Sequence, residues 1–348
     1  MAPFGAHARE HKNGIIDLSQ GTPIDATPEF IQTALKDYSN SPSYPVTIGT
    51  PELRAAMRNW ATNILGASGE FDLLPTIGSK ELVAWLPSIL RAKTVLYPKI
   101  AYPTYLVGSM IYEASAIAVE LDAETWPKSE IAWINSPSNP TGRVHSEKEM
   151  QAAIDYARKN DSLVVSDECY LSFPATGQAP ISILNVAKGN NKNLLAVHSM
   201  SKRSNLAGYR AGLIIGDPEI ISKIREVRKH AGMMVPLPIQ SAMTAALGDE
   251  KHVSEQAVRY SRRREVLSTA LIQAGFEIEF SDAGLYIWCT RHEKSWDSVS
   301  WLAELGILAT PGIFYGEAGT NYIRIALTAT DEQIADATKR ILNSLQRA

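Results

Sequence analysis

The chain has 348 residues, a length that predicts about two domains and a large buried core. Its 34 Lys and Arg residues nearly balance 37 Asp and Glu residues, and the resulting net charge of −3 argues against a nucleic-acid partner. With 45% hydrophobic and 20% charged residues, the composition is that of a compact globular protein rather than a disordered or fibrous one.

Cysteine usage and hydropathy bear on where the protein works. The two cysteines, Cys169 and Cys289, exclude a disulfide framework, and we expect both to be small buried side chains in a reducing compartment. The longest apolar run, residues 82–86, is far shorter than the roughly 20 residues that a membrane helix needs. The first ten residues lack the apolar stretch of a secretory signal. We therefore expect a cytoplasmic protein with no membrane partner.

Short apolar runs recur from about residue 73 and are typical of buried strands. They cover residues 95–97, 117–119, 131–134, 163–165, 194–197 and 213–215. Between two of them, Ser146 and Glu149 form a predicted capping box, and apolar residues at helical spacing follow. This alternation of strands and helices predicts an α/β fold with a largely parallel sheet.

The pattern changes after Leu237. A long amphipathic helix is predicted to end at Gly275, and Arg262, Arg263 and Arg264 are expected on its solvated face. Strands around residues 285–288 and 322–327, a helix around 299–305 and a closing helix over 331–345 follow. These elements predict a second, smaller α+β domain.

Polar side chains follow three of the predicted strands. Lys202 ends a Ser-x-Ser-Lys segment, Asp167 ends a strand, and Asn139 opens an Asn-Pro-Thr-Gly turn. Taken singly, each has an ordinary structural explanation as an exposed loop, a helix cap or a turn. Together, at the edge where parallel strands end, they are the set expected for pyridoxal 5′-phosphate (PLP), a cofactor that acts as an electron sink.

The ordered motifs resemble those of the fold-type I PLP enzymes, specifically the class I/II aminotransferases. The motifs are Asn-Pro-Thr-Gly at 139–142, Asp-Glu-x-Tyr at 167–170, Ser-x-Ser-Lys at 199–202 with Arg210 eight positions on, and Arg-Ile-Ala-Leu at 324–327. The resemblance covers Gly21 to about Leu345 and implies a large domain with a mainly parallel central sheet between helices, plus a smaller α+β domain. It implies an N-terminal segment associated with the small domain (1–40), a large PLP-binding domain (41–250), and an interdomain helix with the small C-terminal domain (251–348).

The same resemblance implies roles for individual residues. Lys202 would bond covalently to the cofactor and move a proton, Asp167 would pair with the pyridine nitrogen, and Tyr170 would bond the phenolic oxygen. The implied cofactor-binding residues are Tyr44, Gly78, Ser79, Lys80, Tyr102, Asn139, Asp167, Tyr170, Ser199, Ser201, Lys202 and Arg210. The implied substrate-binding residues are Gly21, Asn139 and Arg324, with Arg324 on the α-carboxylate. Tyr44 would reach across a homodimer interface.

Residues 49–56, 134–142 and 326–331 resemble N-succinyldiaminopimelate aminotransferases of the actinobacterial type. This implies transamination of N-succinyl-LL-2,6-diaminopimelate with 2-oxoglutarate, in lysine and diaminopimelate biosynthesis.

The sequence departs from the family pattern in three places. The N-terminus is short, which bears on how the site closes, and the usual Pro-Gly-Asp turn near residues 91–94 is absent. Arg203 replaces a small polar residue, and we expect it to affect the preference for substrate charge.

Several alternatives stay open at this point. Aminotransferases for aspartate, LL-diaminopimelate or histidinol phosphate, and PLP-dependent β-lyases, share the lysine, the aspartate and the phosphate cup. A PLP-binding sensor is the non-enzyme alternative, although the segment before Gly21 is too short for a helix-turn-helix module. The absence of a Gly-x-Gly-x-x-Gly turn disfavours a nicotinamide dehydrogenase, and the scattered histidines indicate no metal site.

Overall fold

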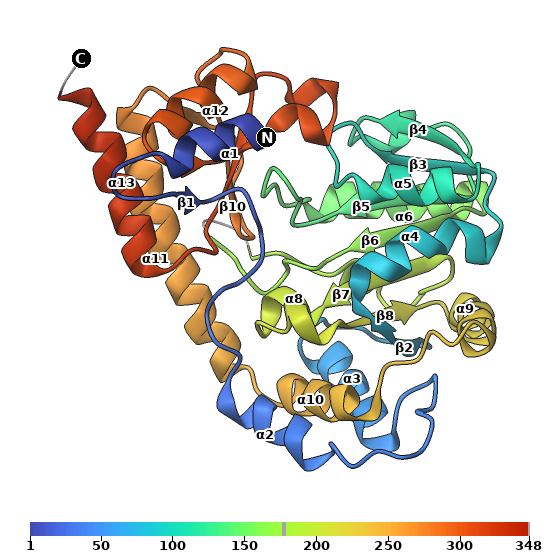
Figure 1. The fold of residues 1–348 in the computed structure, drawn as a ribbon. Coiled ribbons are helices and arrows are strands. Elements are labelled where there is room, and N and C mark those ends of the chain that lie inside the picture. Colours follow the sequence, from blue (N-terminus) through green and yellow to red (C-terminus); the bar gives the residue numbers. More distant parts are fainter. Residues whose placement is uncertain (176–178, 347–348) are drawn as a thin grey trace.

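The computed structural model describes residues 1–175 and 179–346, and its largest element is a seven-stranded sheet (Figure 1). The strand order is β2-β8-β7-β6-β5-β3-β4, with β8 antiparallel to both of its neighbours and the other pairs parallel. The strands are β2 (Asp72–Ile77), β3 (Thr94–Pro98), β4 (Ser115–Val119), β5 (Ile131–Asn135), β6 (Leu163–Asp167), β7 (Leu194–Ser199) and β8 (Ala211–Gly216). The predicted, mainly parallel sheet is confirmed.

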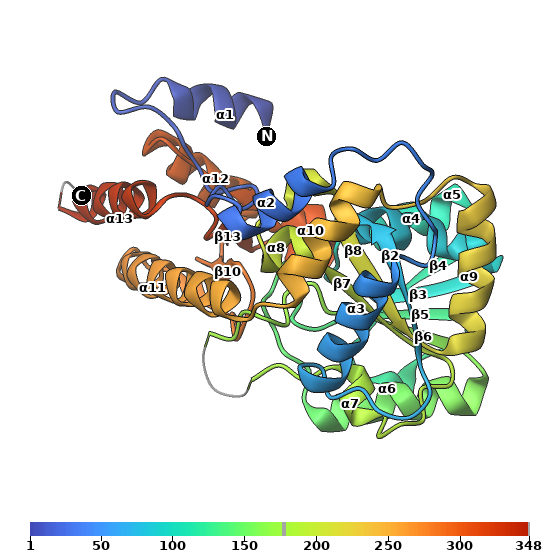
Figure 2. The same ribbon diagram turned by 90° about the horizontal axis from the view of Figure 1, so that it is seen from below.

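Helices cover both faces of this sheet because successive side chains of its strands are apolar on both faces. On β5, Ile131 and Trp133 pack with residues of α4, α5 and α9, whereas Ala132 and Ile134 pack with residues of α3, α6, α7 and α10. Figure 2 shows the strands between these two groups of helices. The helices are α3 (Pro51–Asn63), α4 (Gly78–Leu90), α5 (Thr104–Ile111), α6 (Glu147–Asn160), α7 (Ile183–Val186), α9 (Pro218–His230) and α10 (Leu237–Leu247).

A smaller unit contains the C-terminal part of the chain and confirms the predicted α+β domain. Its four-stranded antiparallel sheet has the order β12-β13-β10-β9, and β1 pairs in parallel with β11. The strands are β1 (Ile16–Asp17), β9 (Glu277–Ile278), β10 (Tyr286–Thr290), β11 (Ile307–Leu308), β12 (Thr310–Pro311) and β13 (Ile323–Ala326). The helices around them are α1 (Ala2–Arg9), α11 (Lys251–Gln273), α12 (Ser295–Glu304) and α13 (Asp331–Leu345).

The N-terminal segment contacts both units. Phe4 of α1 stacks on Trp296 of α12 with ring centroids 5.3 Å apart, and β1 pairs with the small unit's β11. The chain then runs past the middle of the molecule to α2 (Glu29–Asp37), which lies against α10 of the large unit (Figures 1 and 2). The predicted boundaries between segments, at residues 40 and 250, therefore stay a proposal. Helix α2 belongs to the predicted N-terminal segment but packs against the large unit.

The arginines of α11 do not share one solvated face as predicted. Arg262 is 63% exposed, but Arg263 and Arg264 are only 3% and 7% exposed. Arg264 donates hydrogen bonds to the backbone carbonyls of Gly284 and Tyr286, at 2.6 and 2.7 Å. A buried guanidinium is tolerated where acceptors satisfy it, and these acceptors lie outside the helix, at the start of β10. The prediction was wrong for two of the three residues.

Two further features of the described residues are negative. No helix in residues 1–175 and 179–346 combines the length and apolar character needed to cross a membrane. Within the same residues, no three His, Cys, Asp or Glu side chains are grouped so that they could hold a metal ion.

Candidate active site

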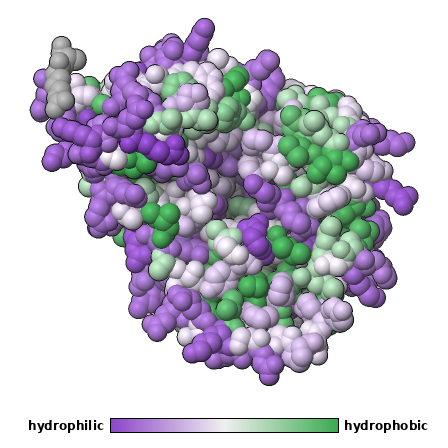
Figure 3. Space-filling model, in the orientation of Figure 1, coloured by the Kyte–Doolittle hydropathy of each residue, from purple (hydrophilic) through white to green (hydrophobic). Residues whose placement is uncertain are grey.

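A cavity of about 670 Å³ lies where the central strands of the large sheet end and β13 of the small unit approaches them. Figure 3 shows the molecule hollowed between the two units on this face. The lining residues are Gly21, Thr22, Ser79, Lys80, Tyr102, Asn135, Asn139, Asp167, Cys169, Tyr170, Ser199, Ser201, Lys202, Ala207, Gly208, Arg210, Tyr286 and Arg324. The cavity brings together every predicted site residue except Gly78 and Tyr44.

The ends of three neighbouring strands position the floor of this cavity. Asp167 is the last residue of β6, and Lys202 lies in α8 (Met200–Arg203), directly after β7. Asn139 lies in the loop after β5, where its N–H donates to Asn135 Oδ1 at 2.7 Å. Asn135 in turn donates to the Asp167 carbonyl at 2.8 Å, so it braces the loop against the neighbouring strand.

Asp167 is a carboxyl group only 5% exposed whose hydrogen-bond donors, among the residues that the structure describes, are neutral. The Tyr105 hydroxyl donates to Oδ2 at 2.8 Å, and the Cys169 N–H donates to Oδ1 at 3.2 Å. Burial raises the pKa of Asp167, and hydrogen bonds from Cys169 and Tyr105 oppose that rise. A cationic nitrogen placed against this carboxylate would stabilise its ionised form.

Lys202 brings a buried amine to the same cavity. Its Nζ donates a hydrogen bond to the Gly21 carbonyl. Burial lowers the pKa of Lys202, and the positive charges of Arg324 and Lys80 lower it further. A lowered pKa leaves more of the amine unprotonated, as attack on an aldehyde requires.

One end of the cavity has the donors that a phosphate needs. Helix α4 begins at Gly78 and Ser79, so unpaired N–H groups and the positive end of its dipole lie there. Ser199, Ser201 and Arg210 line the cavity as well. A Cβ on Gly78 would lie 2.4 Å from Arg210 Nη2, so the glycine allows the guanidinium to approach the start of the helix.

Arg324 brings a cation from the small unit to the opposite side of the cavity. Its Nη1 donates to Asn139 Oδ1 at 2.9 Å, and its Nη2 donates to the Ser19 carbonyl at 2.6 Å. The Arg324 Nε is buried and unpaired among the described residues. No carboxylate pairs with Arg324 in the described part of the chain, so it can receive one from a ligand.

The remaining predicted residues differ in where they lie. Tyr102 lines the cavity, and Lys80 Nζ lies 5.7 Å from the centre of its ring. Gly78 lies directly behind the lining, against Arg210. Tyr44 is 93% exposed and lies outside the cavity of its own chain.

Two expectations about residues near the site are wrong. Arg203 does not line the cavity, because its guanidinium pairs with Glu250, donates to the Ala246 carbonyl at 2.9 Å and lies over the Trp60 ring. It therefore cannot act directly on substrate charge. Cys169 is half-buried rather than buried, and its Sγ lies 3.3 Å from Ser79 Oγ within the cavity lining. Cys289 is buried as expected.

Sequence reasoning missed the remaining lining residues. These are Thr22, Asn135, Cys169, Ala207, Gly208 and Tyr286. Cys169 and Asn135 lie within or beside the recognised motifs, so proximity along the chain could have indicated them. Tyr286 lies in an apolar strand of the small unit, and no pattern in the sequence separates it from a core residue.

Residues 13–341 match the family described as aminotransferase class I and II. The chain belongs to this family. It is 46% identical to the 4-dedimethylamino-4-oxo-anhydrotetracycline transaminase of Streptomyces rimosus, over 98% of this chain and 97% of that protein. It is 47% identical to a probable aminotransferase of Mycobacterium tuberculosis, over 98% of this chain and 83% of that protein. A probable N-succinyldiaminopimelate aminotransferase of Thermus thermophilus has a similar structure, with a TM-score of 0.90 and 26% identity over 99% and 98% of the two chains.

Class I and II aminotransferases depend on PLP, and the cavity of this aminotransferase fits that cofactor. Asp167 is a buried carboxylate that lacks a cationic partner among the described residues, which suits a protonated pyridine nitrogen. Lys202 offers an amine with a lowered pKa, which suits the cofactor aldehyde. The start of α4 and Arg210 offer donors and positive charge, which suit a phosphate dianion.

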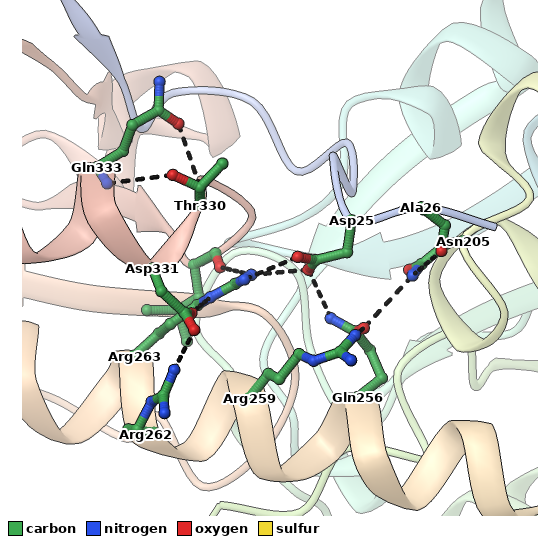
Figure 4. A network of polar contacts seen from close by, with 11 residues as sticks. Asp25, Ala26, Asn205, Gln256, Arg259, Arg262, Arg263, Thr330, Asp331 and Gln333 are labelled. Carbon is green, nitrogen blue, oxygen red and sulfur yellow. Dashed lines mark hydrogen bonds and ion pairs between the residues drawn. The ribbon is translucent and has the colours of Figure 1, made fainter. Parts of the chain in front are cut away.

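The segment that carries Gly21 is anchored by an ion-pair network (Figure 4). Asp25 accepts two hydrogen bonds from Arg263, both at 2.8 Å, and a third from Gln256 at 2.7 Å. Arg263 also donates through Nε to Asp331 at the start of α13, at 2.7 Å. The network thus joins the segment after Gly21 to α11 and α13, which explains why Arg263 is buried.

This network predicts a pH-dependent contribution to stability. Burial alone would raise the pKa of Asp25, but hydrogen bonds from Arg263 and Gln256 lower it below 3.8. Since the folded protein holds this carboxylate ionised, its contribution is present above about pH 4 and is lost as the pH falls through the lowered value. We expect Asp25→Asn to cost about 1–3 kcal/mol at pH 7, with a smaller difference from wild type below pH 4.

Thermal unfolding of both proteins across this pH range measures the difference. Glu219→Gln is the matched control, because the Glu219–Lys223 pair is exposed at 78% and 62%. Such a surface pair contributes about 0–1 kcal/mol, so the control should unfold close to the wild-type temperature. An Asp25→Asn protein as stable as the control at pH 7 would contradict the anchoring role.

Proposed function

We propose that this aminotransferase transfers an amino group between N-succinyl-LL-2,6-diaminopimelate and 2-oxoglutarate, with glutamate as the other amino acid. The single observation that carries the proposal is the Arg324 guanidinium, which faces the Lys202 cavity without a carboxylate partner among the described residues. One such clamp serves the α-carboxylate of both amino acids. The motif resemblance and the name of the Thermus thermophilus neighbour support the choice of substrate. The enzyme would act in cytoplasmic lysine and diaminopimelate biosynthesis.

The residues of the cavity divide the chemistry between them. Bound PLP supplies an electron sink for the charge that develops at the substrate α-carbon. Arg324 and Asn139 would orient the substrate so that its α-hydrogen faces Lys202. Lys202 Nζ would accept that proton and deliver it to the carbon on the other side of the amino nitrogen. Asp167 would hold the pyridine nitrogen protonated, and Tyr170 with Asn139 would donate to the phenolic oxygen.

The assignment of Lys202 predicts one site of covalent attachment. Borohydride should reduce the covalent link between the lysine and PLP to a stable secondary amine. The visible absorption band of the PLP-loaded enzyme should then disappear. Peptide mapping should place the reduced label on Lys202. A label on any other lysine would contradict the assignment.

Two variants separate attachment from catalysis. Lys202→Ala should abolish turnover and the label. Asp167→Ala should keep the label but lower kcat about 10²–10³-fold, because it removes a preorganised charge that acts on the transition state. An Asp167→Ala enzyme with wild-type kcat would contradict the proposed role of the carboxylate.

We propose that Tyr44 completes the site of a partner subunit in a homodimer. Its ring is 93% exposed and lies outside its own cavity. Other apolar side chains of the same part of the chain are exposed as well, namely Ile24, Phe30, Val46 and Ile48. A monomer would leave these side chains in water, whereas a second copy of the chain would cover them.

Complementation tests this shared site. Lys202→Ala and Tyr44→Ala subunits should each be weakly active or inactive alone. Mixed dimers contain one site with both residues, so random mixing should restore about a quarter of the wild-type activity. No gain of activity on mixing, in a preparation shown to contain mixed dimers, would place Tyr44 outside the partner's site.

A second candidate function follows from one comparison. The relative that is 46% identical bears the name of a transaminase for 4-dedimethylamino-4-oxo-anhydrotetracycline. That name favours a cyclic ketone as the amino acceptor. Because such a ketone has no α-carboxylate, Arg324 would then bind only the α-carboxylate of the amino donor.

A panel of substrates distinguishes these candidates. We expect kcat/KM for N-succinyl-LL-2,6-diaminopimelate, with saturating 2-oxoglutarate, to exceed the values for LL-diaminopimelate, aspartate and histidinol phosphate. A tenfold preference for a competitor, about 1.4 kcal/mol of transition-state free energy, would overturn the substrate and leave the aminotransferase activity intact. The tetracycline ketone is assayed as an acceptor with glutamate.

The clamp is tested on the same panel. Arg324→Lys should lower kcat/KM for both N-succinyl-LL-2,6-diaminopimelate and glutamate, because lysine cannot form the bidentate pair with a carboxylate. If only one of these substrates were affected, Arg324 would not be the common clamp.

A further inference from the structure

Tyr286 lines the cavity, and no sequence motif indicated it. Its hydroxyl lies 3.0 Å from the Tyr170 hydroxyl, and the two rings meet edge to face with centroids 5.5 Å apart. Tyr286 is 2% exposed and Tyr170 is 6% exposed. In the described part of the chain, this is the one side-chain hydrogen bond of the Tyr170 hydroxyl.

Three separate elements hold Tyr286 in this position. Arg264 of α11 donates to its backbone carbonyl at 2.7 Å, which fixes the start of β10. The guanidinium of Arg324 lies over its ring at 4.1 Å from the centroid. Gly21 lies against its hydroxyl so closely that a Cβ there would be 1.9 Å from the oxygen. The side chain therefore has little room for another orientation.

The number of protons on the two hydroxyls decides which one donates. A phenol has one proton to donate and oxygen lone pairs to accept with. If Tyr170 uses its proton on the phenolic oxygen of PLP, it can only accept from Tyr286. The charged and titratable groups that face the pair are Arg324 on β13, Lys202 on α8 and Cys169 beside Tyr170. Burial opposes ionisation of Tyr286, but the positive charges of Arg324 and Lys202 and a hydrogen bond from Tyr170 lower its pKa. Once Tyr170 donates to PLP instead, the charge of Arg324 still favours Tyr286 as a donor.

We infer that Tyr286 is a positioning residue that donates its hydroxyl proton to Tyr170 and so holds the Tyr170 hydroxyl as a donor toward the phenolic oxygen of PLP. The inference rests on the contact between Tyr170 and the cofactor in the proposed function. Hydrogen bonds in such a chain strengthen one another, so the second tyrosine increases the donor strength of the first. Tyr286 thereby connects the Arg324 clamp with the electronic state of the cofactor.

The predicted consequence is spectroscopic. A hydrogen bond donated to the phenolic oxygen reduces the negative charge on that oxygen. This charge otherwise stabilises the proton on the Lys202–cofactor linkage. Removing the Tyr286 hydroxyl should therefore raise the pH midpoint at which the visible band of the PLP-loaded enzyme changes. We expect a rise of about 0.5–1 pH unit in Tyr286→Phe, as for the loss of one hydrogen bond.

Two comparisons separate this role from a structural one. Tyr170→Phe should raise the midpoint by more than Tyr286→Phe does. The double variant should have the midpoint of Tyr170→Phe alone, because Tyr286 acts through Tyr170. Tyr315→Phe is the matched control, since Tyr315 is also a buried tyrosine next to Arg324, at 5.1 Å from its ring centroid, and should leave the midpoint unchanged.

Gly21→Ala gives an independent test that keeps both hydroxyls. Its added Cβ should displace the Tyr286 hydroxyl and shift the midpoint in the same direction as Tyr286→Phe. An unchanged midpoint in Tyr286→Phe, or shifts that add in the double variant, would overturn the inference. An unchanged midpoint in Tyr170→Phe would overturn it together with the role of Tyr170. Since no amino donor or acceptor is present, none of these results depends on the substrate assignment.

Discussion

The hydrogen bond between Arg324 and Asn139, 2.9 Å long, joins the two units at the point where substrate and cofactor must meet. Asn139 belongs to the loop after β5 of the large sheet, and Arg324 lies on β13 of the small one. Their contact sets the distance between the carboxylate clamp and Lys202. Tyr286 and Gly21 line the same cavity. Tyr286 contacts both Arg324 and Gly21. The position of the small unit is therefore part of the catalytic geometry.

The cavity is rich in positive charge. Lys80, Lys202, Arg210 and Arg324 line it, whereas Asp167 is its one carboxylate among the described residues. Concentrating cations in a partly closed cavity is costly unless anions enter it. A phosphate dianion and the carboxylates of amino acids and 2-oxo acids supply those anions. Burial is the main cause of the lowered pKa of Lys202, and the neighbouring cations Arg324 and Lys80, which favour anionic ligands, lower it further.

The buried arginines of α11 hold two of the segments that line this cationic cavity. Arg263 ties the segment after Gly21 to α13, and Arg264 holds the strand that carries Tyr286. Arg263 finds acceptors on segments far away in the chain, and Arg264 finds them on the strand after its own helix, so each joins α11 to another element. The small unit is thereby fixed to the N-terminal segment, whose Gly21 and Thr22 line the cavity.

The sequence alone predicted six strands of the large sheet, the main elements of the small unit and the polar residues at the strand ends. Apolar runs and the Ser146–Glu149 capping box predicted strands and helices because these depend on local periodicity, and the ends of parallel strands meet at one edge by geometry. Lys202, Asp167 and Asn139 could be placed together for that reason. The orientations of Arg203, Arg263 and Arg264, the exposure of Cys169 and the place of Tyr286 were decided only by the tertiary structure. Helical spacing shows which residues share a face, but the partners that make a buried guanidinium or phenol favourable come from remote strands and loops.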